Sequence, residues 1–326
     1  MASKQSNGAK DGEFDLIKRL FAPFADAASA GDLQDDAATF TPPPAHDLVI
    51  STDALVCGVH FPDYAAPEMV AARLVGANVS DLAAQGAMPV GCVLTLCIGP
   101  DWDDDFLDAF AAAFKHCLAR FDMPLWGGDT VRGAQSLVSL TVHGIVPQGE
   151  MLARAGARPD QDVYVTGTIG DGYLGLHHAL NQTQGASLQA YAAPNPPIGF
   201  AQQVRQLCSA AIDVSDGLAG DLDHICEASS LAMRIEAAQV PLSPEGAAVA
   251  EAGDLASLLT GGDDYQLVLC ADTGRGDEMA AIADKCGVRL TCIGRTVAAQ
   301  KGAEMAEFYD AEGHLIDLPT RGYRHF

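Results

Sequence analysis

The sequence predicts an α/β (α+β) protein of two domains, from its length, its composition and the order of its hydrophobic patterns. At 326 residues the chain is longer than one hydrophobic core usually organises. Apolar residues make up 48% of it and charged residues 19%, a balance typical of globular proteins. Strand-like and helix-like patterns alternate in two series, separated by a turn-rich stretch at residues 147–160. We therefore expect domains at residues 13–150 and 151–326, preceded by a disordered tail at residues 1–12.

The first series predicts a mixed sheet with helices. Short apolar runs indicate strands, and apolar residues at helical spacing indicate helices. The expected strands are residues 47–52, 91–98, 123–126 and 137–146, and the expected helices are residues 67–86 and 103–121. Pro67 suits the first turn of its helix and Gly86 suits the end, because proline has no N–H to lose there and glycine accepts a left-handed backbone.

The second series predicts another α/β domain by the same criteria. The expected strands are residues 163–166, 211–214, 265–270 and 290–293, and the expected helices are residues 172–180, 217–228 and 278–286. Residues 182–197 contain Pro194, Pro196 and Pro197, which interrupt helices, so this stretch predicts mostly loop.

Composition limits the function classes. The net charge of −24 repels nucleic acid and anionic membrane, so neither is expected as a partner. The N-terminus has no secretory pattern, and no apolar run reaches the ~18–20 residues that cross a bilayer. Nine cysteines without CxxC spacing indicate neither a disulfide framework nor a zinc site, and they favour a cytoplasmic location.

Acidic residues repeatedly stand at the ends of predicted strands, beside small residues. The clusters are Asp35-Asp36-Ala37-Ala38, Ser51-Thr52-Asp53, Asn78-Val79-Ser80-Asp81, Gly127-Gly128-Asp129-Thr130, Asp213-Val214-Ser215-Asp216-Gly217 and Gly261-Gly262-Asp263-Asp264. Mg²⁺ takes oxygen ligands, usually one or two carboxylates with phosphate and water. Each cluster alone could equally be a turn or a helix cap, in which the carboxylate accepts a backbone N–H. Together they favour a metal–phosphate site, because adjacent like charges are costly unless cations neutralise them.

Other phosphate and catalytic motifs are missing. The sequence has no GxxxxGK[ST], so it is not a P-loop enzyme, and no HRD, DFG, GxSxG or HExxH set occurs. The spacing of Gly167, Gly170 and Gly172 indicates a strand-to-helix turn rather than a dinucleotide fingerprint.

The ordered clusters resemble the thiamine-monophosphate kinase family, which belongs to a superfamily with aminoimidazole ribonucleotide synthetase and selenophosphate synthetase. The matching segments cover the chain after the tail. They are GEF at residues 12–14, DDAA at 35–38, STDALVCGVHF at 51–61, NVSDLAAQGAMP at 78–89, WGGDTVRG at 126–133, residues 143–171, AIDVSDGLAGDLDHI at 211–225, TGGDDYQL at 260–267 and GYRHF at 322–326.

The resemblance implies a two-domain aminoimidazole ribonucleotide synthetase-like fold and a homodimer formed through the N-terminal sheet. It also implies ATP-dependent phosphorylation of thiamine monophosphate to thiamine diphosphate, assisted by several Mg²⁺ ions. The nucleophile would be a phosphate oxygen that is already anionic, so no side chain is expected to act as a general base.

The resemblance also assigns roles to individual positions. The expected Mg²⁺ ligands are Asp36, Ser51, Thr52, Asp53, Asp81, Asp129, Asp213 and Asp216. The expected ATP contacts are Gly128, Asp129, Arg154 and Ser215. The expected contacts to thiamine monophosphate are His60, Asp263 and Tyr323. Taken alone, His60 would more often be structural, Arg154 a surface residue, and Tyr323 an anchor for the chain end.

Two positions depart from the family pattern. The family usually has Gly-x-Gly before the paired aspartates, where this chain has Asp32-Leu33-Gln34, and it commonly has Glu where this chain has Gln266.

Other functions are also consistent with parts of the pattern. Aminoimidazole ribonucleotide synthetase is the alternative enzyme, and a catalytically inactive nucleotide-binding homologue is the alternative of another class. Selenophosphate synthetase would carry a reactive cysteine near the N-terminus, but no cysteine precedes Cys57. A hydrogenase-maturation relative would end in cysteine, and this chain ends in Phe326.

Overall fold

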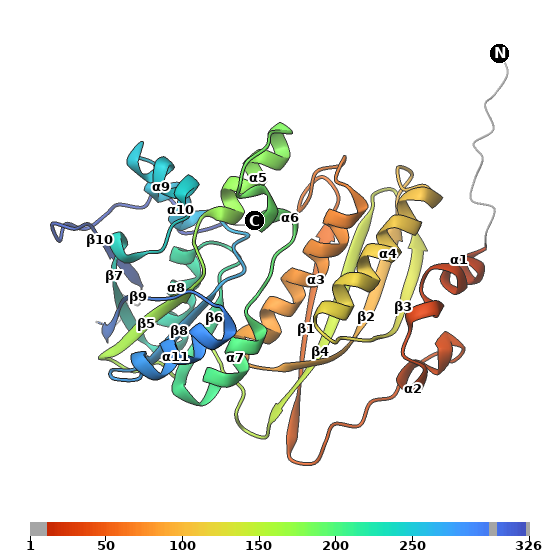
Figure 1. Ribbon diagram of the computed structural model, residues 1–326, viewed down its shortest axis with the longest axis horizontal. Coiled ribbons are helices and arrows are strands. Elements are labelled where there is room, and N and C mark those ends of the chain that lie inside the picture. Colours follow the sequence, from red (N-terminus) through yellow and green to blue (C-terminus); the bar gives the residue numbers. More distant parts are fainter. Residues whose placement is uncertain (1–11, 300–304, 324–326) are drawn as a thin grey trace. The chain divides into compact units, whose positions relative to one another are not determined.

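A computed structural model describes residues 12–299 and 305–323 of the chain (Figure 1). The expected disordered tail, apart from Gly12, lies outside the described residues. The chain forms two compact units. Unit 1 comprises Met1–Pro42, Ile50–Asn78 and Pro89–His143, and unit 2 comprises Pro43–Val49, Val79–Met88 and Gly144–Phe326. The predicted domain boundary near residue 150 stays a prediction.

The smaller sheet has four strands in the order β1-β4-β2-β3. Its strands are β1 (His46–Val56), β2 (Met88–Ile98), β3 (Leu125–Arg132) and β4 (Leu137–Pro147), with β2 and β3 parallel. Helices α3 (Pro67–Ala84) and α4 (Asp104–Arg120) cover one face of it (Figure 1). On that face Leu96 and Leu140 are fully buried, whereas Ile50 on β1 is 57% exposed. Buried and more exposed side chains alternate along the strands, so one face of the sheet packs against the helices and the other carries the more exposed side chains.

Short helices precede this sheet. They are α1 (Glu13–Leu20), α2 (Ala27–Ala30) and two 3-10 turns, Ala22–Phe24 and Gly31–Leu33. Helix α1 buries Leu16 and Leu20, one turn apart, while its opposite side carries charged residues. This spacing is that of an amphipathic surface helix.

The larger sheet has six strands in the order β10-β7-β9-β5-β8-β6. Its strands are β5 (Gln161–Thr166), β6 (Cys208–Asp213), β7 (Leu231–Glu236), β8 (Leu267–Asp272), β9 (Leu290–Ala298) and β10 (Ala306–Tyr309). Neighbours pair antiparallel except β10 and β7, which are parallel. The sheet is therefore mixed.

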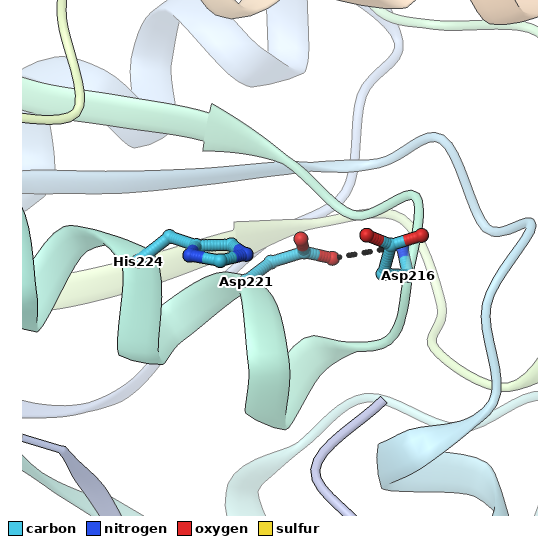
Figure 2. A group of neighbouring side chains, drawn as sticks. All are labelled: Asp216, Asp221 and His224. Atoms are coloured by element: carbon cyan, nitrogen blue, oxygen red, sulfur yellow. Dashed lines mark hydrogen bonds between the residues drawn. The ribbon is translucent and has the colours of Figure 1, made fainter. Parts of the chain in front are cut away.

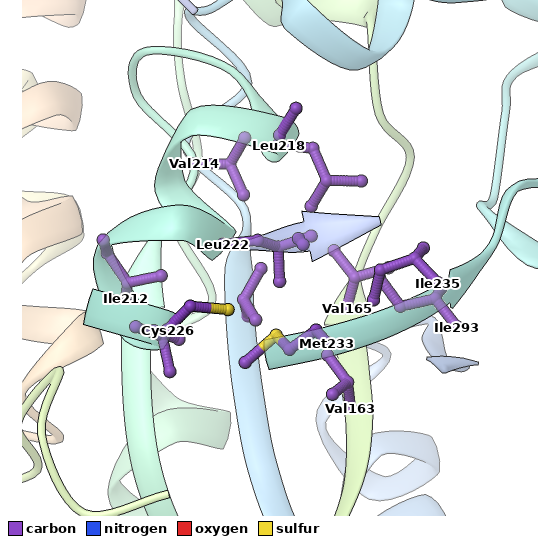
Figure 3. Packing of buried hydrophobic residues seen from close by; sticks show 14 of the residues in the cluster. Val163, Val165, Ile212, Val214, Leu218, Leu222, Cys226, Met233, Ile235 and Ile293 are labelled. Carbon is purple, nitrogen blue, oxygen red and sulfur yellow. The ribbon is translucent and has the colours of Figure 1, made fainter. Parts of the chain in front are cut away.

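Helices pack on both faces of the larger sheet. Helix α8 (Leu218–Ser229) covers one face, where Leu222, Cys226 and Met233 belong to one buried cluster (Figure 3). Helices α7 (Ile198–Val204) and α11 (Gly276–Cys286) contribute Phe200 and Met279 to a second cluster. The remaining helices are α5 (Asp171–Asn181), α6 (Leu188–Ala192), α9 (Pro244–Glu251) and α10 (Leu255–Thr260), with 3-10 turns at Arg205–Leu207 and Ala237–Gln239.

Every predicted strand and helix is present, and the helix bounds agree within two residues. Some strands end later than expected: β3 ends at Arg132 rather than at residue 126, and β9 ends at Ala298 rather than at residue 293. The structure adds elements that were not predicted. Strand β7 alternates Leu231, Met233 and Ile235 and was readable as a strand, but β10 has only four residues. Helix α6 lies inside the stretch expected to be mostly loop, since its five residues precede the first proline there. All nine cysteines are free thiols. Among the helices in the described ranges, none has both the length and the apolar character needed to span a bilayer.

Candidate functional site

A cavity of about 430 Å³ in unit 1 collects residues from four separate segments of the chain. Asp35 and Asp36 come from the loop after the second 3-10 turn, and Asp129 comes from β3. Phe14 and Trp126 provide apolar lining. With Glu13, the cavity combines four carboxylates with aromatic surface, so it can hold cations at one part and a flat apolar group at another.

Strand β3 carries Gly128 and Asp129 in its interior, not at its end as expected. The strand continues to Arg132 because its pairing with β2 continues, with Gly128 opposite Leu94 and Asp129 opposite Thr95. A Cβ at Gly128 would lie 2.2 Å from the carbonyl oxygen of Leu94. Only glycine permits this close approach of β3 to β2. At the neighbouring Gly127, which also lines the cavity, a Cβ would meet nothing within 4 Å.

The loop before Asp35-Asp36 has a backbone that favours glycine. Asp32 and Leu33 have φ of 57° and 56°, in the left-handed region. Asp32 stands at the first glycine of the family's Gly-x-Gly and Leu33 at its middle position, whereas Gln34, at the second glycine, has a φ of −99°. The chain therefore adopts a glycine-like conformation with residues that are strained in it.

Leu33→Gly should keep or raise the free energy of unfolding, and Leu33→Val should lower it. A left-handed non-glycine residue costs about 1–2 kcal/mol, whereas glycine loses about 0.5–1 kcal/mol through the entropy of the unfolded chain. A β-branched valine fits the left-handed region worse than leucine does. Urea unfolding of the three proteins measures the order, and a glycine variant less stable than the valine variant would contradict the strain.

Ser51, Thr52 and Asp53 also lie inside a strand, β1, rather than at its end. The Thr52 hydroxyl is 3.0 Å from that of Thr141, and the backbone N–H of Asp53 donates to Oδ1 of Asn78 at 2.9 Å. Side chains alternate along a strand, so Thr52 points away from the side shared by Ser51 and Asp53. A single ion bound by all three would need a backbone carbonyl from one of them.

His60 lies in the turn after β1. Its Nδ1 accepts the backbone N–H of Val56 at 2.9 Å. In the neutral ring this places the hydrogen on Nε2, which makes Nε2 a donor. Nε2 is therefore the nitrogen of the neutral ring that can donate a hydrogen bond.

In unit 2, segments far apart in the sequence meet around the loop after β6. The hydroxyl of Ser80 donates to the carboxylate of Asp213 at 2.7 Å, and both side chains are buried. The carbonyl of Ser215 accepts the N–H of Asp263 at 2.9 Å. The carbonyl of Asp216 accepts the N–H of Tyr323, also at 2.9 Å.

These contacts bring together six of the predicted positions, among them both Ser215 and Asp216. Asp81 follows Ser80 directly in α3, and Asp213 ends β6. The other four lie in the segments just described: Ser215, Asp216, Asp263 and Tyr323. The two loops approach closely at Gly262, where a Cβ would lie 2.3 Å from the carbonyl oxygen of Ser215. We call this group the loop junction.

The loop junction includes a carboxylate that the sequence interpretation missed. Oδ2 of Asp221, in the first turn of α8, accepts the N–H groups of Ser215, Asp216 and Gly217 at 3.0, 3.2 and 3.1 Å. Figure 2 shows Asp221 between Asp216 and His224, with one potential metal-ligand atom of each within 4.8 Å of the others. Burial raises the pKa of Asp221, and the charges of Asp213 and Asp216 raise it further. The sequence feature that could have indicated this role is an aspartate in the first turn of a helix that begins directly after Gly217.

Asp264 confirms the cap interpretation for one member of a cluster. Its buried carboxylate accepts the N–H groups of Gly170 and Gly172, each at 2.8 Å, at the start of α5. Burial raises the pKa of Asp264 to about 8. Its neighbour Asp263 has a left-handed φ of 69° and accepts the Tyr265 hydroxyl at 3.2 Å. The paired aspartates therefore differ, with one holding a helix start and the other at the loop junction.

The surroundings of two further positions, Arg154 and Gln266, are also defined by hydrogen bonds. Arg154 is exposed and follows Ala153, whose carbonyl accepts the N–H of Ala211 in β6. Gln266, the second departure, accepts the Thr166 hydroxyl at 2.8 Å through its side-chain oxygen. A neutral amide can accept this bond as a carboxylate would, so the loop junction does not depend on the lost charge.

Comparison with known proteins first gives the class. Residues 34–146 match the AIR synthase related protein, N-terminal domain, and residues 158–306 match the AIR synthase related protein, C-terminal domain. The two matches follow one another along the chain, the first over the strands of the smaller sheet and the second over those of the larger sheet up to the start of β10. The fold is the two-domain α/β fold of this superfamily.

Individual relatives then give the family. Thiamine-monophosphate kinase of Escherichia coli (strain K12) is 37% identical over 325 residues, which cover 97% of this chain and 98% of the relative. That of Caulobacter vibrioides is 39% identical over 323 residues, covering 96% and 90%. The chain belongs to the thiamine-monophosphate kinase family.

Solved structures agree with this placement. The kinase from Stenotrophomonas maltophilia K279a superposes with a TM-score of 0.78 and 32% identity, covering 85% of this chain and 89% of that one. AaThiL complexed with AMPPCP and TMP gives a TM-score of 0.76 and 25% identity, covering 99% and 100%. That relative was therefore solved with a nucleotide analogue and TMP bound together.

Proposed function

We propose that this chain transfers a phosphoryl group from ATP directly to thiamine monophosphate, with Mg²⁺ ions neutralising charge on the transferring group. The thiamine-monophosphate kinase activity follows from family membership. The observation that supports the finer mechanism is the gathering of dispersed aspartates, in the cavity of unit 1 and at the loop junction of unit 2.

Electrostatics requires cations in such a reaction. The protein has a net charge of −24, and both ATP and thiamine monophosphate are anionic at their phosphates. Carboxylates would repel these phosphates unless divalent ions stood between them. Mg²⁺ suits this role because it binds one or two carboxylates together with phosphate oxygens and water. The residues proposed to hold it are Asp36, Ser51, Thr52, Asp53, Asp81, Asp129, Asp213 and Asp216.

For the nucleotide we propose contacts at Gly128, Asp129, Arg154 and Ser215. Gly128 lines the cavity beside Gly127, where a Cβ would meet nothing within 4 Å, so a phosphate can approach the backbone of this glycine pair. The aromatic lining of the same cavity suits a base. Arg154 is exposed, and its planar guanidinium can bind phosphate oxygens in pairs. Phosphoryl transfer depends mostly on alignment and charge neutralisation, so these contacts supply what the chemistry needs.

For thiamine monophosphate we propose contacts at His60, Asp263 and Tyr323. The orientation of His60 presents Nε2–H as a donor to phosphate. Thiamine carries a positive ring, so a carboxylate at Asp263 and an aromatic face at Tyr323 suit it. Tyr323 is 52% exposed, which leaves ring surface available for stacking.

The test is release of ADP from ATP, measured with and without thiamine monophosphate and with and without Mg²⁺. We expect turnover only when both are present, and we expect chelation with EDTA to abolish it reversibly. Isothermal titration with a non-hydrolysable ATP analogue gives a second readout, because binding should also require Mg²⁺. Equal nucleotide binding after chelation would contradict the metal bridge.

We also propose that the chain acts as a homodimer in the cytoplasm. Strand β1 stands at an edge of its sheet, and Leu48 and Ile50 on it are 41% and 57% exposed. An exposed apolar edge strand favours pairing with another chain. A monomer mass in sedimentation equilibrium would contradict the dimer.

A further inference from the structure

An ion pair between Arg321 and Asp223 connects the chain segment that carries Tyr323 to helix α8. Nε of Arg321 donates to Oδ2 of Asp223 at 2.7 Å, and Nη2 donates to Oδ1 at 2.7 Å. The two side chains are only 24% and 20% exposed. A two-point guanidinium–carboxylate pair fixes orientation as well as distance, and partial burial makes it stronger than a surface pair.

The same pair joins two further elements. Nη2 of Arg321 also donates to the carbonyls of Ala306 at 2.7 Å and Ala219 at 3.3 Å. Asp223 accepts the N–H of Ala306 at 2.8 Å. The pair therefore lies where α8, the start of β10 and the segment at residues 321–323 meet. Its many partners indicate one defined position for that segment.

Beyond Arg321, the backbone runs against the loop junction. A Cβ on Gly322 would lie 2.9 Å from the carbonyl oxygen of Asp216, and one on Gly220 would lie 2.9 Å from that of Arg321. Two glycines thus allow the segment to approach both α8 and the loop. The next residue, Tyr323, donates its N–H to the carbonyl of Asp216 at 2.9 Å.

We propose that Arg321 and Asp223 are positioning residues that set Tyr323 against the Asp216 loop for binding of the thiamine ring. Neither side chain is assigned a contact with substrate, and their effect passes through the backbone of residues 321–323. The inference rests on the proposed substrate contact of Tyr323. It adds a specific expectation: the affinity for thiamine monophosphate should depend on the Arg321–Asp223 ion pair. Neither residue is among the proposed metal ligands or nucleotide contacts.

The experiment compares Arg321→Ala and Tyr323→Ala with the parent enzyme in steady-state kinetics. Arg321→Ala should raise the KM for thiamine monophosphate about 10-fold, the scale expected for losing charged hydrogen bonds. Tyr323→Ala should raise it by about the same factor, because it removes the aromatic face proposed for the cationic ring. The KM for ATP should stay within about 2-fold, and kcat should change less than the KM for thiamine monophosphate. Hydrogen exchange at residues 316–323 should become faster in Arg321→Ala.

Two further variants separate positioning from general stability. Arg321→Lys keeps the charge but lacks the planar fork, so its KM should lie between those of the parent and Arg321→Ala. Arg275→Ala is the control, because it removes another arginine–carboxylate pair, that of Arg275 and Glu278 on α11, on the other face of the same sheet. This control should leave both KM values unchanged.

The outcomes test two hypotheses separately: that Tyr323 contacts the substrate, and that the Arg321–Asp223 pair positions Tyr323. If Tyr323→Ala raises the KM for thiamine monophosphate and Arg321→Ala does not, the ion pair does not position the tyrosine. If Tyr323→Ala has no effect, the proposed substrate contact itself is wrong, and the inference fails with it. Should Arg321→Ala fail to fold, Arg321→Lys replaces it, and an unchanged KM in that variant overturns the proposal.

Discussion

Asp213→Asn should lower kcat by about 100-fold or more, the effect typical of removing one preorganised electrostatic stabiliser. Asp213 ends β6, is only 5% exposed and accepts the Ser80 hydroxyl at 2.7 Å. Asparagine has nearly the same shape and its amide oxygen can accept the same hydrogen bond. The substitution therefore removes the negative charge and leaves the packing, so activity should fall while the fold persists.

Two variants sharpen this expectation. Ser80→Ala removes the hydrogen bond but keeps the carboxylate, so it should cost much less activity than Asp213→Asn. Asp129→Asn alters the carboxylate in the unit 1 cavity and should also lose most activity. Circular dichroism and thermal unfolding monitor the fold in each case. Unchanged turnover in both aspartate variants would show that these carboxylates are not the metal ligands we propose.

Much of the fold could be predicted because its strands and helices are long and strongly patterned. Helices α3 and α4 have 18 and 17 residues, and glycine or proline marks their ends or the following turn. The strand ends were harder to predict. Strands β1 and β3 continue through Asp53 and Asp129 because backbone pairing, not apolar side chains, carries the strand there. Polar side chains at exposed strand positions give no signal of strand in the sequence.

The candidate site was predictable as a set of residues but not as a set of contacts. Composition indicated that clustered aspartates need cations, yet it could not distinguish a ligand from a cap. Asp264 and Asp263 are neighbours of the same type, and only the fold shows that Asp264 holds the start of α5. Asp221 was missed for the same reason, because its three N–H partners are defined by the turn after β6 rather than by spacing.

Asp221→Ala should lower kcat/KM for ATP by about 100-fold and raise the Mg²⁺ concentration required for half-maximal activity. Alanine leaves three N–H groups of a largely buried loop without their acceptor, and each such loss costs about 1–3 kcal/mol before relaxation. We expect the loop to relax and to displace Ser215 and Asp216, the proposed nucleotide and metal contacts. The free energy of unfolding should fall as well, which urea denaturation measures.

Asp221→Asn distinguishes positioning from charge. All three N–H groups converge on one carboxylate oxygen, and an amide oxygen can occupy the same place without the charge. Burial already disfavours the charged form of Asp221, since its pKa is raised. The asparagine variant should therefore keep activity within about 10-fold of the parent, a loss well below that caused by removing the acceptor altogether.

His224→Ala is the matched control, because His224 is the exposed neighbour in the same group and is not one of the three N–H donors to Asp221. We expect it to leave the Mg²⁺ dependence unchanged. If Asp221→Asn lost as much kcat/KM for ATP as Asp221→Ala does, Asp221 would have an ionic role, as a metal ligand beside Asp216. A partial recovery would instead separate two kinds of aspartate at the loop junction. Asp213 and Asp216 then bind cations, and Asp221 shapes the backbone that presents Asp216.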